Sequence, residues 1–161
     1  MNVFKSSDEK VKESSLQQFS VQTWNGNGYN ELIKNNLTKS GKQIDTTGFT
    51  EMHTKHENAV LKGNMLLSGC GDINDPFAGV GLLLSEKAEN ALVYASAISS
   101  HILMARFSGR STNTTVIIAF IPHRGHKQDN FQQTTYDLLE RTIAAVSEHD
   151  CLIVMGDFNA V

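Results

Sequence analysis

Short apolar runs closed by turn residues dominate this sequence and restrict it to folds that are built on β-sheets. Apolar runs of roughly four to eight residues are typical of strands, whereas helices need longer segments. Other segments predict strands by alternating apolar and polar residues or by their content of β-branched residues. The predicted strands of all these kinds are Phe19–Trp24, Ile44–Thr50, Asn64–Ser68, Gly79–Leu84, Leu92–Ser99, Ile102–Phe107, Thr115–Ile121 and Cys151–Met155. Pro122 ends the most apolar of them, because proline has no N–H for a sheet ladder. The sequence therefore predicts about eight strands.

Two segments have helical spacing instead, with apolar residues recurring at intervals of three and four. They are 29–40, which Gly41 would end, and 129–149. Each lies between two predicted strands, and a strand, a helix and a strand with short joints form a parallel unit. Only a polar break separates Leu92–Ser99 from Ile102–Phe107, which predicts an antiparallel hairpin. The predicted class is α/β, with mixed sheets and helices outside.

Length and composition favour one globular domain. The chain has 161 residues, of which 40% are hydrophobic and 19% charged. A net charge of −3 excludes a basic nucleic-acid-binding module, so contact with a polyanion requires a local basic patch or metal ions. The polar segment 1–18 predicts a disordered arm ahead of a domain over 19–161. It resembles neither a secretory signal nor a membrane anchor, so we expect an intracellular protein of the nucleus or cytoplasm.

The two cysteines, Cys70 and Cys151, have no metal-ligand spacing. One disulfide between them is arithmetically possible. Cys151 opens a strand that we expect to be buried on both faces, however, and this position favours a free core thiol in a reducing compartment.

Polar residues follow four of the predicted strands at the point where each strand ends. These stretches are 25–27, 51–53, 120–123 and 157–159. Polar groups at the ends of apolar strands can converge on one edge of a sheet, where sites often lie. Asp157 and Asn159 are two residues apart, so in extended backbone both side chains point the same way. A carboxylate and an amide side by side suit metal-bound phosphate or an attacking water, although each stretch alone is also typical of an ordinary turn.

Three of these stretches resemble motifs of the endonuclease/exonuclease/phosphatase superfamily, which includes deoxyribonuclease I. They are Trp24-Asn25, Gly48-Phe49-Thr50-Glu51 and Gly156-Asp157-Phe158-Asn159. The runs 78–85 and 154–160 are most similar to the endonuclease domains of non-LTR retrotransposons of the RTE/Bov-B type, and to host proteins that resemble that branch. The resemblance covers residues 21–160. It implies a four-layered α/β sandwich of the deoxyribonuclease I-like type, in which two mixed sheets lie face to face with helices outside.

The resemblance also implies catalytic roles for four residues. Glu51 would be the direct ligand of a hard cation, Mg²⁺ with Mn²⁺ as a possible substitute, and Asn25 would stand beside it at the metal site. Asp157 would orient or activate the attacking water. Asn159 would hydrogen-bond the phosphate and help to stabilise the developing charge.

The same resemblance implies DNA as the partner, contacted through its phosphate backbone, with no membrane and no small-molecule cofactor. Asn27 stands where related nucleases carry a second polar contact, often aspartate, and the amide removes a charge. His123 and Arg124 follow a strand end, and their cationic groups are expected beside a phosphate backbone. A solvated turn before a helix is the alternative for these two residues.

Two departures from the family speak against activity of the chain as printed. Phe120 stands where the family commonly has a tyrosine, whose hydroxyl reaches the substrate phosphate. The family also continues past its Gly-Asp-Phe-Asn motif to a Ser-Asp-His motif with the catalytic histidine, whereas this sequence ends at Val161. These departures imply an incomplete sandwich with its second half missing, impaired catalysis, and open strand edges that promote aggregation.

The histidines of this chain match no family position. His149 is expected at the end of the helix 129–149, where it suits the helix dipole. His53 and His56 are expected in a solvated loop, with metal binding as the alternative.

Three functions therefore remain open. The first is a Mg²⁺-dependent DNA endonuclease derived from a retroelement. The second is a non-catalytic retroelement remnant that binds nucleic acid or a protein partner. The third, which the residues after Pro122 disfavour, is a phosphatase or phospholipase of the same superfamily.

Overall fold

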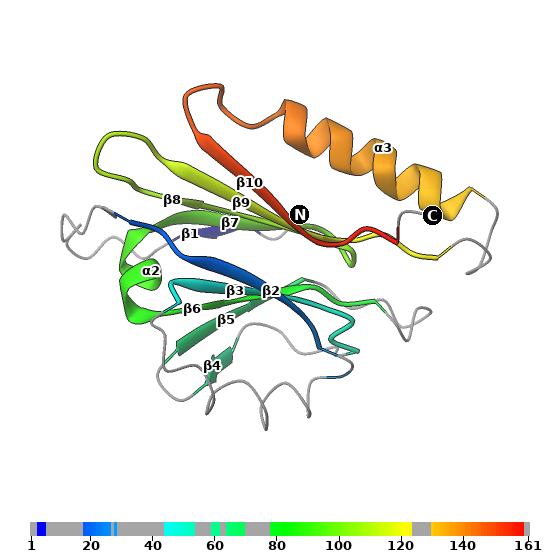
Figure 1. Cartoon of the computed structure of the whole chain (residues 1–161), viewed down its shortest axis with the longest axis horizontal. Helices are drawn as coiled ribbons and strands as arrows, with labels where there is room; N and C mark the ends of the chain where they lie inside the picture. The colour runs from blue at the N-terminus through cyan, green and yellow to red at the C-terminus, as the bar shows by residue number, and fades with distance from the viewer. Residues whose placement is uncertain are drawn as a thin grey trace.

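Two mixed β-sheets lie face to face in the computed structural model of the chain (Figure 1). The structure describes residues 3–5, 18–26, 28, 44–53, 59–61, 64–69, 78–123 and 130–159, with the backbone alone for 3–5, 59–61 and 64. The first sheet has the strand order β1-β7-β8-β9-β10, and the second has the order β2-β3-β6-β5-β4. This arrangement confirms the predicted α/β sandwich of two mixed sheets.

The first sheet contains β1 (Val3–Lys5), β7 (Leu92–Ser99), β8 (Ile102–Phe107), β9 (Thr114–Phe120) and β10 (Cys151–Asp157). Strands β7 and β8 form the predicted hairpin, β9 is antiparallel to β8, and β10 is parallel to β9. Helix α3 (Phe131–Ala144) connects β9 to β10 and covers the outer face of the sheet (Figure 1). Its apolar positions recur at three- and four-residue spacing, so they form one stripe that packs on β9.

The second sheet contains β2 (Val21–Asn25), β3 (Thr46–Thr50), β4 (Ala59–Leu61), β5 (Asn64–Ser68) and β6 (Gly81–Leu84). Strands β2 and β3 are parallel, as predicted, and the other pairs are antiparallel. The helix predicted for 29–40 lies outside the described residues. Helix α2 (Glu86–Ala91) leads from this sheet into the first, and the Ser85 hydroxyl caps it by accepting from the Ala88 N–H at 3.2 Å.

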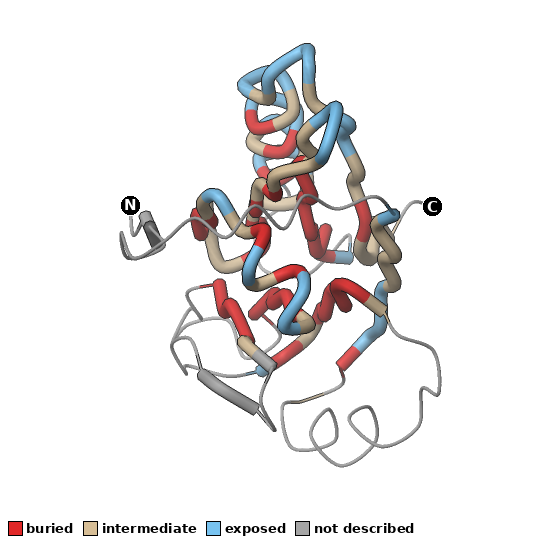
Figure 2. The backbone as a smooth tube through the Cα atoms, turned by 90° about the vertical axis from the view of Figure 1, so that its left-hand side faces the viewer, coloured by how far each residue is buried: buried red, intermediate tan, exposed pale blue. Residues whose placement is uncertain are grey.

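The main hydrophobic core fills the space between the sheets, where Figure 2 shows the buried segments gathered. Val116 and Ile118 belong to one buried cluster with Leu82 and Leu84. Full burial of each such side chain stabilises the fold by about 1.5–3 kcal/mol. Gly48 of β3 allows a close approach of the sheets, because a Cβ there would lie 2.6 Å from Cδ1 of Ile118 and 2.8 Å from the Met155 methyl.

Strand β10 is more exposed than the sequence predicts. Its first two residues, Cys151 and Leu152, are exposed, and Met155 is its only buried residue. The strand lies at the edge of its sheet, so no described strand pairs with its second side. The prediction of a strand buried on both faces is therefore wrong, and Cys151 is a free, exposed thiol. Cys70 lies outside the described residues.

Two boundaries also differ from the sequence predictions. Helix α3 ends at Ala144, and His149 lies in the turn before β10 with its side chain 88% exposed, so the predicted role at a helix end is wrong. Within the segment predicted to be a disordered arm, Val3–Lys5 forms β1 by pairing antiparallel with β7. No helix in the described part of the chain is long and apolar enough to cross a membrane.

Candidate functional site

The carboxyl ends of β2, β3, β9 and β10 lie on the same side of the sandwich, at the right in Figure 1. Strands β2 and β3 are parallel neighbours in one sheet, and β9 and β10 are parallel neighbours in the other. Strand β10 packs against both β2 and β3. The described polar residues at these four strand ends therefore share one edge of the molecule, as the sequence predicts.

Asn25 and Glu51 are joined directly at this edge. The Asn25 amide Nδ2 donates to Glu51 Oε1 at 3.0 Å. Asn25 is the register partner of Thr50, so parallel pairing places the carboxamide beside the residue that follows β3. The backbone fixes the same corner, because Gly26 N donates to the Thr50 carbonyl at 2.8 Å and Gly28 N to the Glu51 carbonyl at 2.9 Å.

Met52 anchors the turn that carries Glu51. Its side chain is fully buried, and its N–H donates to the Gly79 carbonyl at 3.0 Å. A Cβ at Gly81 would collide with the Met52 sulfur, and Gly79, with φ +123°, lies against the Met52 backbone. Gly79, just before β6, and Gly81, its first residue, therefore leave the space that the Met52 side chain occupies.

The Asp157–Asn159 turn closes β10 with a geometry that the sequence does not predict. Asn159 has φ +40°, so its backbone is left-handed, and the extended backbone that the prediction assumed does not continue to Asn159. The Asn159 N–H donates to Asp157 Oδ1 at 3.1 Å. The Asn159 amide Nδ2 donates to the Ile121 carbonyl at 2.9 Å, which ties the turn to the end of β9.

Tyr136 on α3 holds the same turn from outside the sheet. Its hydroxyl donates to the Phe158 carbonyl at 2.8 Å, between the two polar residues of the motif. This role of Tyr136 was not predicted from the sequence. The available signal was a tyrosine on the apolar face of the helix, at three-residue spacing from Leu139, because a buried tyrosine hydroxyl needs a partner.

Phe120 and His101 form an aromatic stack beneath the strand ends. Phe120 is buried, and its ring stacks on that of His101 with centroids 5.6 Å apart. The Phe131 ring meets the His101 ring edge-on, with centroids 5.3 Å apart. His101 is only 3% exposed, although its place in a hairpin break is typical of a solvated residue. The buried position of Phe120 therefore suits an apolar ring that has no hydroxyl to hydrogen-bond.

The donor set at the edge fits a hard divalent cation. Glu51 supplies a carboxylate and Asn25 a carboxamide, and Mg²⁺ is commonly held by one or two carboxylates together with waters and substrate phosphates. His53 Nε2 lies 3.9 Å from Glu51 Oε2. In the described part of the chain, no three His, Cys, Asp or Glu side chains gather as a metal cluster.

Some of the residues predicted to contact substrate or metal lie outside the described part of the chain. Asn27, Arg124 and His56 lie outside the described residues. His123 is described, and it is exposed just beyond the end of β9. Its position agrees with the predicted edge, and its contact with phosphate stays a prediction.

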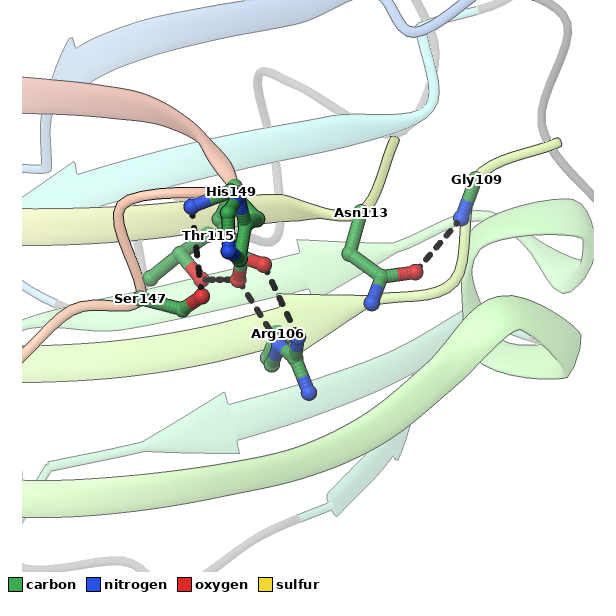
Figure 3. A network of polar contacts seen from close by, with 7 residues as sticks. Arg106, Gly109, Asn113, Thr115, Ser147 and His149 are labelled. Atoms are coloured by element: carbon green, nitrogen blue, oxygen red, sulfur yellow. Dashed lines mark hydrogen bonds and ion pairs between the residues drawn. The ribbon is translucent and has the colours of Figure 1, made fainter. Parts of the chain in front are cut away.

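A second polar network lies at the opposite end of β10 (Figure 3). Arg106 donates to the Asp150 carboxylate through Nη2 at 2.8 Å and Nε at 2.7 Å, and the Thr115 hydroxyl donates at 2.7 Å. The Arg106 hydrogen bonds, followed by that of Thr115, hold the pKa of the Asp150 carboxyl below its ordinary value, although burial opposes them. This network joins β8, β9 and the turn before β10, and every Asp150 oxygen is used.

Comparison with known sequences finds no matching family model. Craniofacial development protein 2 of Tragulus javanicus is 23% identical over 159 residues, which are 96% of this chain and 27% of that protein. The Bos taurus protein of the same name is 22% identical over 159 residues, or 96% of this chain and 26% of that protein. This chain is similar to craniofacial development protein 2. It spans about a quarter of the length of these curated relatives.

Among solved structures, the endonuclease domain of TRAS1, a telomere-specific non-LTR retrotransposon, aligns with a TM-score of 0.51 and 10% identity. The alignment covers 73% of this chain and 49% of that domain. The chain has an endonuclease-like fold. This likeness confirms the predicted deoxyribonuclease I-like architecture. A fold does not fix an activity, so the chemistry has to be argued from the residues at the strand ends.

Proposed function

We propose that this protein is a Mg²⁺-dependent endonuclease that hydrolyses phosphodiester bonds of DNA. The observation that carries the proposal is the common edge, where the Asn25–Glu51 pair and the Asp157–Asn159 turn end two facing sheets. Carboxylates and amides around one point are the groups that phosphodiester hydrolysis requires, because the substrate is anionic and repels hydroxide.

Glu51 and Asn25 would hold the cation, with Mn²⁺ as a substitute for Mg²⁺. When bound, such a cation neutralises phosphate charge, lowers the pKa of its water and supports the leaving oxygen. The Asn25 hydrogen bond to Oε1 fixes the orientation of the Glu51 carboxylate. The buried Met52 anchor keeps that carboxylate at the edge, which reduces the reorganisation needed when substrate binds.

Asp157 would orient the attacking water and accept its proton. One carboxylate oxygen is fixed by the Asn159 N–H, and the other has no hydrogen-bond partner among the described residues. Asn159 spends one amide N–H on the Ile121 carbonyl, and its second N–H would donate to a phosphate oxygen. His123, with Asn27 and Arg124, would contact the DNA backbone near the scissile phosphate.

A second candidate is a non-catalytic protein that binds nucleic acid or a partner through the same edge. Phe120 favours it, because this buried ring has no hydroxyl to offer to a phosphate. The phosphatase or phospholipase alternative has no observation of its own in its favour.

Nicking of supercoiled plasmid in the presence of Mg²⁺ tests the proposal. We expect nicking by the parent and a loss of about 100-fold or more for Asp157→Asn, since this carboxylate acts only on the reacting water. Asp137→Asn is the matched control, because Asp137 is an exposed aspartate on α3 whose carboxylate accepts from the exposed Gln133 amide. Equal background from all three proteins, with retained DNA binding, would support the binding protein instead. Hydrolysis of inositol phosphates in place of plasmid would support the phosphatase alternative.

A further inference from the structure

We propose that His53 is a nitrogen ligand of the cation held at Glu51, so that the site binds Mn²⁺ in preference to Mg²⁺. The inference rests on the proposed cation site and extends it from an all-oxygen site to one with mixed oxygen and nitrogen ligands. Among the described residues, His53 is the histidine whose side chain lies beside Glu51.

The spacing of the two side chains suits a shared cation better than a direct bond. Glu51 Oε2 and His53 Nε2 are 3.9 Å apart, which is beyond hydrogen-bond distance. Two ligands that each lie about 2.1 Å from one ion are roughly 3.0–4.2 Å apart, depending on the angle between them. The observed separation falls inside that range, so the side chains could bind one ion with little movement.

The backbone holds the pair in place. Glu51 and His53 have φ values of +52° and +50°, which are uncommon for residues other than glycine, and the fully buried Met52 lies between them. Such conformations persist only where the surroundings enforce them. Here Met52 packs against Gly79 and Gly81 in the core, while Glu51 beside it is half-buried and His53 is exposed at the edge.

The ligand types decide the metal preference. A carboxylate and a carboxamide favour Mg²⁺, which takes oxygen ligands and keeps several waters. Imidazole favours first-row transition metals, whose affinity for nitrogen-containing sites rises from Mn²⁺ onward. Addition of His53 to Glu51 and Asn25 therefore shifts the site from Mg²⁺ towards Mn²⁺.

The chain contains a matched control pair. His149 Nε2 lies 4.0 Å from Glu148 Oε1, nearly the same separation, but these side chains are 88% and 90% exposed. Among the described residues, no carboxamide is bonded to that carboxylate, and neither Glu148 nor His149 has a positive φ. Separation alone thus does not distinguish the two pairs, whereas the fixed backbone and Asn25 do.

The test is Mn²⁺ titration followed by electron paramagnetic resonance, with electron spin echo envelope modulation of the bound ion, at about pH 8 where imidazole is neutral. We expect ¹⁴N modulation in the parent and in His149→Gln. In His53→Gln the modulation should be lost and Mn²⁺ affinity should fall at least about tenfold, with Mg²⁺ affinity, measured by competition, changing less than twofold. Glu51→Gln should abolish binding of both ions, while Glu148→Gln should leave it unchanged.

The outcomes separate this inference from the proposed function. Mn²⁺ bound to the parent without nitrogen modulation, or an equal loss of affinity in His149→Gln, overturns the role of His53 and leaves the cation site standing. Nitrogen modulation without plasmid nicking supports His53 and contradicts the endonuclease. Absence of any Mn²⁺ binding overturns both. Circular dichroism of each variant confirms that the fold is retained.

Discussion

The two aspartates at the ends of strand β10 differ in burial and in hydrogen bonding. Asp150 precedes it, has a side chain only 2% exposed, and uses both oxygens in bonds to Arg106 and Thr115. Asp157 ends it, is half-buried, and uses one oxygen in a bond to the next turn. A carboxylate with every oxygen engaged holds strands together, whereas one with an oxygen left over can bind a water or a substrate.

The difference arises from position along the same pair of strands. At the amino end of β10, Arg106 of β8, which lies on the far side of β9, supplies a guanidinium that compensates the burial of the Asp150 charge. At the carboxyl end, the Asp157 carboxylate accepts from the Asn159 N–H, and it forms no ion pair among the described residues. The charge of Asp157 is thus available to a ligand, and we expect the two aspartates to control different properties of the protein.

The close pairing of β10 with β9, on which the positions of both aspartates depend, requires Gly156. A Cβ there would collide with the Ala119 carbonyl of β9, and φ +143° strains any other residue. We expect Gly156→Ala to lower the free energy of unfolding by more than about 4 kcal/mol, or to prevent folding, as measured by urea unfolding.

Gly48→Ala is the control for that change. Its neighbours are the flexible ends of Ile118 and Met155, so overpacking should cost only about 1–3 kcal/mol. A Gly156→Ala protein as stable as Gly48→Ala would show that β10 does not need this close approach to β9.

Asp150→Asn tests the structural role of the network at the amino end of β10. The variant keeps the shape but leaves the Arg106 charge without its partner, so we expect a loss of about 2–3 kcal/mol in the free energy of unfolding. The matched change Asp137→Asn on the surface of α3 should alter stability by less than about 0.5 kcal/mol. Equal stability of the two variants would contradict the structural role of the network.

The pH dependence of stability should report the same network. The pKa of Asp150 is held below its ordinary value of 3.8 in the folded state, chiefly by the Arg106 hydrogen bonds. Its stabilisation is complete above the ordinary value and is lost as the pH falls through the folded value. The gap in unfolding free energy between the parent and Asp150→Asn should therefore stay constant from neutral pH to about pH 5 and shrink below pH 3.8. A gap that widens in acid would contradict this direction.

Tyr136→Phe should have the smallest effect on stability of these changes, and it should affect the Asp157–Asn159 turn at the carboxyl end of β10. Loss of the bond to the Phe158 carbonyl is expected to cost about 0.5–1.5 kcal/mol of stability. Because the ring still packs, the expected change in nicking is a few-fold decrease in kcat with KM unchanged. If the decrease appears in KM instead, Tyr136 acts on substrate binding rather than on the turn.

Much of this fold could be predicted because its signals are local. Apolar runs and turn residues predicted the hairpin of β7 and β8, the parallel pair β2 and β3, and the strand ends that carry Glu51 and Asp157. Side chains that depend on distant partners could not be predicted this way. The sequence around Cys151 is typical of a buried strand, and only the sheet order makes it an exposed edge.

The same limit applies to the site. Nothing in the sequence distinguishes Asp150 from Asp157 by environment, because Arg106 is far away along the chain. Tyr136 and the buried His101 depend likewise on packing between elements. The left-handed turn at Asn159 is held by bonds to Asp157 and to the Ile121 carbonyl beyond the end of β9, so the extended backbone assumed from the sequence does not apply there.

The most direct test of the account is the plasmid-nicking rate per folded molecule for Asp157→Asn and Asp150→Asn, measured side by side with Mg²⁺ and corrected by the folded fraction of each. We predict that Asp150→Asn keeps the rate of the parent within about twofold, and that Asp157→Asn loses about 100-fold or more. Equal rates for the two variants would contradict the assignment of Asp157 to the chemistry and Asp150 to the fold.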